Sequence, residues 1–376
     1  MKKKICALLT CCMLLTLAGC NKFPFANETS ADPSETVTQT TAADTQSSQF
    51  PMAAVFIPTT TTEETNPDGT LIFSQSTQNI SLTIQDPEVA DKVILDFLNR
   101  IDTHNQSSQA ILESAKANYN PEHWTPYLCH TLYNPTRIDQ GVLSLFGDYV
   151  EYNGSMHASK TNISVSYDLT NGDVLTLAGI LKIGASTESF PELVIAKLAE
   201  KAEELSLYTG YEDFVKQRFQ RAPSQDEAFY FTPAGLCFYF APYEIAPYAT
   251  GTISVEIPYE QLVGILDDSY FPAESHETDG NIQITPFNPD DMGQYSQIVE
   301  AIVSSDGMML SAQADDTVYN VKITVKGPDG QSHDKVLFAS QALSPGDALV
   351  IQATQDELLT MVITYENNAG TQEIHF

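Results

Sequence analysis

Residues 17–20, Leu-Ala-Gly-Cys, end a short apolar run near the N-terminus and match the lipobox of bacterial lipoproteins. In that motif the cysteine thiol is acylated, typically with palmitate, and the segment before it is cleaved. Three lysines open the chain, and the apolar segment 5–17 is too short to span a bilayer comfortably. We therefore expect a lipoprotein signal peptide over residues 1–19. Cys20 would then carry the lipid that tethers the mature chain, outside the cytoplasm, to the membrane of a bacterium of Gram-positive type. The alternative is an ordinary secretory signal in which Cys20 is incidental.

Beyond Cys20, no group of residues forms a recognisable catalytic or metal-binding motif. The seven histidines include no close metal-ligand pair, and neither His-Glu-x-x-His nor Cys-x-x-Cys occurs. The Gly-x-Ser-x-Gly nucleophile motif and phosphate-binding glycine loops are absent as well. We therefore expect no metal, no cofactor and no catalytic residue, and this expectation favours a binding protein.

Carboxylates that perform acid–base chemistry leave no local signature, so an enzyme stays open as an alternative. Under that hypothesis, a hydrolase or another cell-wall-modifying enzyme would use Glu151, Asp168 or Glu244. A third hypothesis is a structural module that docks to another protein of the cell envelope.

A second group of residues is suited to binding. Tyr243, Glu244 and Tyr248 lie between two apolar, strand-like segments, and nearby prolines restrict the backbone around them. Tyrosine offers a large contact area at low entropic cost, so such a loop could recognise sugar rings or a basic protein surface. His157, which follows a glycine, is the fourth candidate ligand-binding residue. The alternative is that these aromatic residues pack against helices and the glycine merely turns the chain.

The six cysteines leave two thiols for the folded part of the chain. Three depart with the predicted signal peptide and Cys20 carries lipid, so Cys129 and Cys237 remain. In an oxidising compartment they could form one disulfide. Equally, they could be two unrelated buried apolar residues.

The charge of the chain restricts its partners. With 49 acidic and 18 basic residues, the formal charge is −31, and cleavage that removes three lysines makes it −34. So acidic a chain will not attract nucleic acid or an anionic membrane surface. It attracts cationic partners, although salt confines that attraction to within about 10 Å. The acidity could also serve only to keep an exposed surface in solution, and the oligomeric state is not predicted.

The elements that must position these residues begin after a tether. Residues 20–70 are rich in Thr, Ser, Ala, Gln and Pro, and they cannot bury enough apolar surface to offset the entropy of ordering. We therefore expect a disordered tether there. An apolar island at residues 52–58, Met-Ala-Ala-Val-Phe-Ile-Pro, could dock onto the folded part.

Residues 71–272 alternate between strand-like and helix-like patterns. Asp86 and Pro87 mark a helix start, as N-cap and first-turn proline. The apolar positions that follow recur every four residues and give one helix face. They are Val89, Val93, Phe97 and Ile101. A second amphipathic helix is expected at 190–207, and a short closing helix at 259–266.

Strands are expected between and after these helices. Their predicted ranges are 80–84, 124–133, 141–152, 161–168, 174–177, 229–231, 236–240 and 253–257. Helices that punctuate hairpin-connected strands favour an α+β fold with mixed or antiparallel sheets, here in two subdomains divided near residue 185. Residues 281–376 then show short alternating runs separated by turn signals, which predicts a small all-β domain, an Ig-like β-sandwich.

Segments 152–157, 229–251 and 255–262 carry a resemblance to known families. Together they resemble a tandem pair of bacterial domains of unknown function. The same pair is similar to the extracytoplasmic region of RsiV-like lysozyme-sensing anti-sigma factors, over about residues 75–270. The resemblance implies a lysozyme-binding surface in this region. Unlike the anti-sigma factors, the chain has neither a cytoplasmic sigma-binding segment nor a transmembrane helix, and residues 281–376 lie outside the resemblance.

These observations together lead to one expected function. We expect a surface-tethered, non-enzymatic binding lipoprotein that recognises peptidoglycan or another cell-wall glycan, or a cationic wall-attacking protein such as lysozyme. Salt separates the two ligands, because binding of lysozyme should weaken steeply as salt rises and binding of a neutral glycan should not.

Overall fold

The computed structural model describes residues 52–220, 228–273, 277–326 and 335–376. The predicted signal peptide, Cys20 and the predicted tether up to residue 51 lie outside these residues. Strands outnumber helices and form several sheets, with a β-rich C-terminal region, so the predicted α+β class is confirmed. Within the described residues, no helix has both the length and the apolar character that crossing a membrane requires.

The six α-helices are α1 (Pro87–His104), α2 (Ser108–Asn118), α3 (Phe190–Ala199), α4 (Tyr211–Gln220), α5 (Tyr259–Leu262) and α6 (Gln355–Leu358) among the described residues. The N-terminal strands are β1 (Ala54–Phe56), β2 (Thr59–Thr65), β3 (Leu71–Gln78), β4 (Ser81–Thr83), β5 (Tyr127–Ile138), β6 (Val142–Tyr152) and β7 (Ser159–Asp168). The middle strands are β8 (Phe229–Phe231), β9 (Gly235–Phe240) and β10 (Ile253–Pro258). The C-terminal strands are β11 (Ile282–Pro286), β12 (Gln297–Ile302), β13 (Met308–Ala314), β14 (Val318–Val325), β15 (Lys335–Leu343), β16 (Asp347–Ala353), β17 (Met361–Asn367) and β18 (Gly370–His375).

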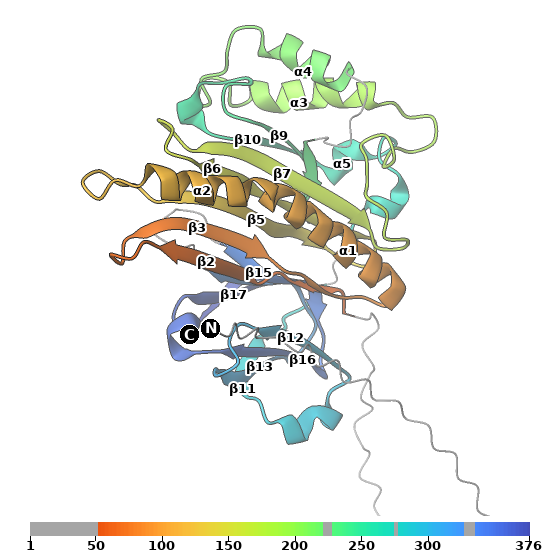
Figure 1. Ribbon diagram of the computed structural model, residues 1–376. Coiled ribbons are helices and arrows are strands. Elements are labelled where there is room, and N and C mark those ends of the chain that lie inside the picture. Colours follow the sequence, from red (N-terminus) through yellow and green to blue (C-terminus); the bar gives the residue numbers. More distant parts are fainter. Residues whose placement is uncertain (1–51, 221–227, 274–276, 327–334) are drawn as a thin grey trace, which may run out of the picture. The chain divides into compact units, whose positions relative to one another are not determined.

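A five-stranded sheet, ordered β2-β3-β5-β6-β7, carries α1 and α2 on one face (Figure 1). Helix α1 begins where the sequence predicts, because the Asp86 carboxylate accepts hydrogen bonds from the amides of Glu88 and Val89 at 2.9 and 3.4 Å. Its predicted apolar face is buried against the sheet, together with Leu143 and Leu145 of β6. The predicted pairing of the strands around 124–133 and 141–152 is confirmed as the antiparallel pair β5–β6.

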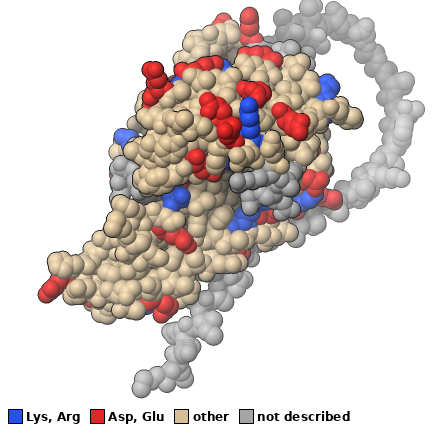
Figure 2. Space-filling model, turned by 90° about the horizontal axis from the view of Figure 1, so that it is seen from above, with Lys and Arg blue, Asp and Glu red and all other residues tan. Residues whose placement is uncertain are grey.

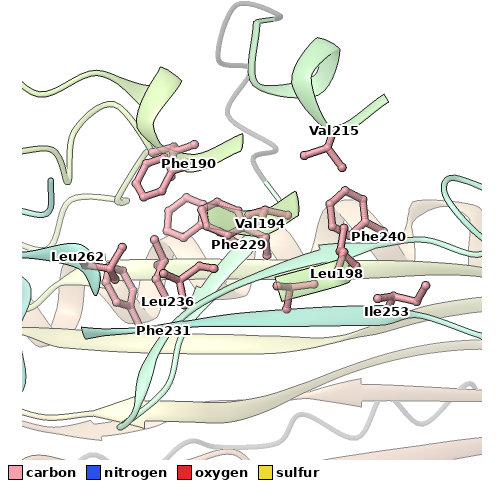
Figure 3. Close-up of a cluster of buried hydrophobic side chains, with 14 of the residues drawn as sticks. Phe190, Val194, Leu198, Val215, Phe229, Phe231, Leu236, Phe240, Ile253 and Leu262 are labelled. Carbon is pink, nitrogen blue, oxygen red and sulfur yellow. The ribbon is translucent and has the colours of Figure 1, made fainter. Parts of the chain in front are cut away.

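A three-stranded sheet, ordered β10-β9-β8, lies between two layers. Helices α3 and α4 cover one face, and their side chains share a core with alternate residues of all three strands (Figure 3). The opposite face places Tyr230 and Tyr239 against Phe146 of β6, with ring centroids 4.4 and 4.9 Å away. This sheet therefore joins its helices to the five-stranded sheet.

Two further sheets form the C-terminal region. One is ordered β18-β17-β14-β15-β1-β4 and the other β11-β13-β16-β12, and they share one hydrophobic core. The predicted β-rich C-terminal region is thus confirmed. Its limits differ from the prediction, however, because the larger sheet includes two strands, β1 and β4, that lie far earlier in the chain than residue 281.

Strand β1 corrects the predicted tether, which was wrong in extending to residue 70. The strand is hydrogen-bonded to β15 on one side and to β4 on the other. Its six-residue segment 52–57 is buried, with no residue more than 8% exposed, and its side chains alternate between two cores. The C-terminal core receives Met52, Ala54 and Phe56, and the core beneath α1 receives Ala53, Val55 and Ile57. The apolar island is therefore a central strand that belongs to both regions.

The region around α3 differs from the prediction in two places. The helix expected over 190–207 ends at Ala199, and turns follow it. A separate helix, α4, follows the turns and was not predicted. The return strand expected at 174–177 is reduced to one bridge, between Tyr167 and Val174.

Candidate functional site

The two folded-region cysteines do not form the disulfide that the sequence left open. Both thiols are free and buried. Cys129 lies on β5 among Ile72 and Phe73, whereas Cys237 lies on β9 between tyrosines in a separate apolar cluster. Burial raises the pKa of both thiols, that of Cys237 to about 12 with help from the neighbouring Glu256 carboxylate. The alternative of two separate buried cysteines is therefore the one that the structure shows.

The three carboxylates of the enzyme hypothesis lie on different elements, and two of them are far apart. Glu151 on β6 accepts hydrogen bonds from the hydroxyls of Ser107 and Tyr149. It is paired with the first residue of β7, whereas Asp168 is the last residue of that strand, about 30 Å away at the rise of an extended chain. Glu244 lies on the other sheet's loop. Glu151 and Asp168 therefore do not form an acid–base pair, and the contacts of Glu244 are with Arg218 and the Ala241 amide.

The loop that follows β9, residues 241–251, is firmly held at its base. Ile245 and Ala246 are 1% and 3% exposed and belong to the core beneath α3 and α4. The amide of Tyr208 donates to the carbonyl of Ile245 at 2.9 Å, and the Thr250 hydroxyl donates to the carbonyl of Leu205 at 3.3 Å. The loop is therefore held both by its buried residues and by hydrogen bonds to the segment 205–208.

Glu244 belongs to the support of this loop. Its Oε2 atom accepts a hydrogen bond from the amide of Ala241 at 2.7 Å and lies 3.4 Å from Nη1 of Arg218. Arg218, on α4, also donates to the carbonyl of Tyr239 at 2.8 Å and lies over the ring of Phe240. The candidate carboxylate thus joins the loop to α4, and its role as a direct ligand contact stays a prediction.

The two candidate tyrosines project from this rigid base into solvent. Tyr243 is 67% exposed and Tyr248 is 51% exposed, and their ring centroids lie 5.4 Å apart with an interplanar angle of 32°. Tyr243 has φ of 72°, a left-handed conformation that costs an L-residue roughly 1–2 kcal/mol. The fold maintains this strain while leaving the side chain outside the core.

His157 reaches the same surface from the end of the β6–β7 hairpin. Its ring centroid lies 6.5 Å from that of Tyr248. Gly154, with φ of 87°, turns the chain just before it, and the backbone there lies so close to the Tyr127 hydroxyl that no Cβ would fit. We call His157, Tyr243 and Tyr248 the aromatic platform. Three of the four candidate residues are thus brought together, and the fourth supports them.

Sequence reasoning missed the neighbouring segment 203–208. Tyr208 is 41% exposed and hydrogen-bonds to the platform loop, and Ser206 has φ of 52°. Among the described residues, only three non-glycine residues have positive φ, and two of them, Ser206 and Tyr243, lie in these adjoining segments. The segment also carries the exposed Glu203 and Glu204. Its composition alone gave no signal, because its relation to the loop depends on packing.

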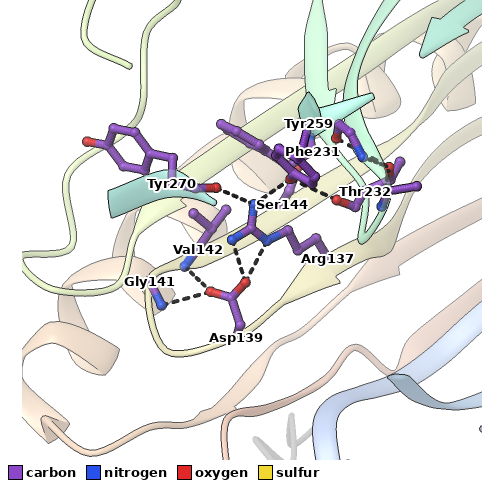
Figure 4. A network of polar contacts seen from close by, with 11 residues as sticks. Arg137, Asp139, Gly141, Val142, Ser144, Phe231, Thr232, Tyr259 and Tyr270 are labelled. Carbon is purple, nitrogen blue, oxygen red and sulfur yellow. Dashed lines mark hydrogen bonds and ion pairs between the residues drawn. The ribbon is translucent and has the colours of Figure 1, made fainter. Parts of the chain in front are cut away.

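A buried polar network joins the platform-bearing sheet to the five-stranded sheet (Figure 4). Arg137 pairs with Asp139, with 2.5 Å between Nη2 and Oδ2, and its Nη1 donates to the Tyr259 hydroxyl and the Tyr270 carbonyl at 2.5 and 2.7 Å. The other Asp139 oxygen accepts from the amides of Gly141 and Val142, each at 2.8 Å. Both charged groups in this network, Arg137 and Asp139, have partners, which indicates that the network serves to connect the two sheets.

The face that carries α3 and α4 shows more Asp and Glu than Lys and Arg (Figure 2). Exposed acidic residues lie within and just after these helices, including Glu192, Glu200 and Asp213. Several are offset by lysine, as in the pairs Lys197–Glu200 and Lys216–Glu192. The face of α3 and α4 is therefore mildly acidic, and lysine side chains pair with some of its carboxylates.

Residues 181–260 match the family described as a protein of unknown function (DUF3298), so a DUF3298 domain is present in this chain. The domain contains α3, α4, the three-stranded sheet and the loop of Tyr243 and Tyr248, but not His157. A DUF3298 family protein from Pseudomonas aeruginosa PAO1 is similar in structure, with 18% identity, a TM-score of 0.41, and coverage of 58% of this chain and 97% of that one. A family member from Bacteroides fragilis NCTC 9343 gives 19%, 0.42, 58% and 96% for the same quantities. No curated protein matches the chain.

Proposed function

We propose that this protein is a surface-tethered, non-enzymatic binding lipoprotein and that the aromatic platform is its ligand-binding surface. The ligand is a cell-wall glycan or a cationic wall-attacking protein such as lysozyme. Cys20 carries the lipid, and the chain acts outside the cytoplasm of the bacterium that makes it. The relationship to lysozyme-sensing anti-sigma factors belongs to the same proposal.

The observation that carries this proposal is the left-handed conformation of Tyr243. A non-glycine residue in this region of φ is uncommon and persists only where its surroundings hold it there. Here the surroundings are the buried Ile245 and Ala246 and the contact of Glu244 with Arg218. The strained conformation places the exposed side chain of Tyr243 beside that of Tyr248. Large aromatic side chains held rigidly at a surface dominate the energetics of many interfaces.

Calorimetry with lysozyme tests the protein-ligand arm of the proposal. The lipid-free chain, residues 21–376, is titrated with lysozyme at low and at physiological salt. Binding at the micromolar level or tighter, weakened about tenfold or more by Tyr243→Ala or Tyr248→Ala, supports a role in sensing or inhibiting lysozyme. The exposed Met308 lies on a different sheet, so Met308→Ala serves as the matched control. No heat at either salt removes lysozyme from the proposal and leaves the glycan.

The lipid anchor has its own test. Cells that express the full chain are fed an alkyne-labelled fatty acid, and the label on the protein is measured beside its distribution between membrane and medium. Label that disappears in Cys20→Ser, with release or retention of the precursor, supports the anchor. Unchanged labelling of that variant contradicts it.

A further inference from the structure

The side-chain polar groups of the aromatic platform have no hydrogen-bond partner among the described residues. Among the described residues, the hydroxyls of Tyr243 and Tyr248 and the imidazole of His157 make ring contacts with one another but no hydrogen bond or ion pair. Each is exposed and so is hydrated in the free protein. The platform therefore offers two phenol hydroxyls and one imidazole as donors or acceptors, grouped around aromatic ring faces.

Two carboxylates near the base of the platform are already paired. Glu244, beneath Tyr243, is occupied by Arg218 and the Ala241 amide. Asp148, which Asn162 links to Thr252 at the end of the loop, pairs with Lys160 at 2.9 Å. A site built for a lysine or arginine side chain needs a carboxylate free to form a charge-assisted hydrogen bond. Neither of these two supplies one, and the exposed Glu203 and Glu204 lie on the adjoining segment 203–208 rather than within the platform itself.

The two phenol rings and the imidazole together fit a neutral, amphipathic ring as ligand. One face of a pyranose ring presents C–H groups that pack against an aromatic ring, and its hydroxyls project at the edge, where phenol and imidazole groups reach them. The rigid loop also removes most of the entropic cost of ordering the binding groups.

We propose, building on the proposed function of this surface, that the aromatic platform binds a neutral sugar of the N-acetylglucosamine type by stacking on Tyr243 and Tyr248. In this arrangement His157 hydrogen-bonds to the hydroxyl or acetamido groups of the sugar. Glu203 and Glu204, the exposed carboxylates on the adjoining segment, take no part. They are the groups that a cationic protein would use in place of the sugar.

The probe is chitotetraose, a neutral oligomer of N-acetylglucosamine, titrated into residues 21–376 with heat and tyrosine fluorescence as readouts. We expect a dissociation constant between about 10 μM and 1 mM that changes less than about twofold between low and physiological salt. Tyr248→Ala and Tyr243→Ala should each weaken binding by about tenfold or more, and Tyr248→Phe by only about threefold, because the ring stays and only the hydroxyl is lost. Far-UV circular dichroism and the melting temperature confirm that each variant is folded.

The double variant Glu203→Gln/Glu204→Gln decides between the two ligands. Unchanged affinity for chitotetraose in this variant supports the sugar. Loss of chitotetraose affinity in the double variant, steep weakening with salt, or no effect of either tyrosine variant overturns the inference. If chitotetraose fails to bind while lysozyme binds in a manner that requires Tyr248, the sugar is excluded and the proposed function stands. If neither ligand binds, the platform is not a binding site for either and both proposals fail.

Discussion

Two arginine–carboxylate pairs flank the three-stranded sheet, and they differ in almost every respect except composition. Arg137 and Asp139 lie between the two sheets, with side chains 3% and 10% exposed, and each has several further hydrogen bonds. Arg218 and Glu244 lie at the base of the platform loop, 26% and 34% exposed, with a longer contact of 3.4 Å. The first pair joins layers of the fold, and the second fixes the direction of a surface loop.

This difference distinguishes polar residues that stabilise the fold from polar residues that are free to bind a ligand. Where polar groups are buried, their partners are almost complete, because an unpaired buried charge is costly. Where they are exposed and make no side-chain hydrogen bond to the residues that the structure describes, as on the aromatic platform, their hydrogen-bonding capacity is available to a ligand. The carboxylate of Asp347, buried with one oxygen unpartnered among the described residues, departs from this rule.

Arg137→Ala should have the largest effect. Removing the guanidinium leaves Asp139 buried without its counter-ion and removes the donor to Tyr259 and Tyr270. We expect a loss of roughly 3–5 kcal/mol in the free energy of unfolding, measured by urea denaturation. Arg218→Ala is the matched control and should cost much less. Similar losses from the two variants would show that burial does not distinguish the pairs.

Asp347→Asn should change the dependence of stability on pH. Burial raises the pKa of Asp347 to about 6, from an ordinary value of 3.8, so the folded state binds this proton more tightly than the unfolded state does. The stabilising contribution of the protonated form is complete below pH 4 and is lost as pH rises to about 6. We expect Asp347→Asn to be more stable than the parent above pH 6 by roughly 2 kcal/mol. Parallel stability curves for the two proteins between pH 4 and 7 would contradict this assignment.

Tyr243→Gly should change stability and ligand binding in opposite directions. Glycine adopts positive φ freely, but it also loses more entropy on folding, so we expect stability to rise by about 0–1 kcal/mol. Ligand binding should nonetheless fall by about tenfold, because the exposed ring is gone. Thermal unfolding and calorimetry on one preparation measure both. A less stable variant that binds normally would mean that the left-handed tyrosine is structural.

Glu244→Gln should have the smallest effect. Glutamine still accepts the hydrogen bond from Ala241, and the lost ion pair is partly exposed, so the expected cost is below about 1 kcal/mol. Binding should weaken no more than about threefold, because the loop stays in place. A loss as large as that of Tyr248→Ala would instead place the carboxylate in contact with the ligand.

Local patterns predicted the parts of the fold that depend on local chemistry. The start of α1 at Asp86 and Pro87, its buried face, and the β5–β6 pair all follow from capping and periodicity. Strand β1 was missed because the six apolar residues that contain it lie inside a Thr-rich stretch. Its pairing with β4 and β15 cannot be read from that local sequence. Helix α4 was missed because only Tyr211 and Val215 of its ten residues are buried, too few to make a pattern.

The sequence predicted which residues make up the candidate site, but not how they are brought together. Tyr243 and Tyr248 stand out in the sequence because they flank prolines on a short loop between strands. That His157 lies beside Tyr248 depends on how one hairpin meets another sheet, and no sequence interval encodes that distance. Likewise, the sequence cannot tell whether Glu244 faces a ligand or Arg218, because the arginine is 26 residues away on a helix that was not predicted.

Strand β1 also determines how the protein would respond to mechanical load. A chain anchored upstream of residue 52 would transmit tension directly into a central strand with hydrogen-bonded neighbours on both sides. Tension along the axis of such a strand loads its perpendicular hydrogen bonds in shear, so they must rupture together rather than peel apart one after another. The same segment also fills two cores, so extracting it would open both regions at once. An anchor upstream of residue 52 would therefore pull on one of the places in the fold best suited to withstand tension.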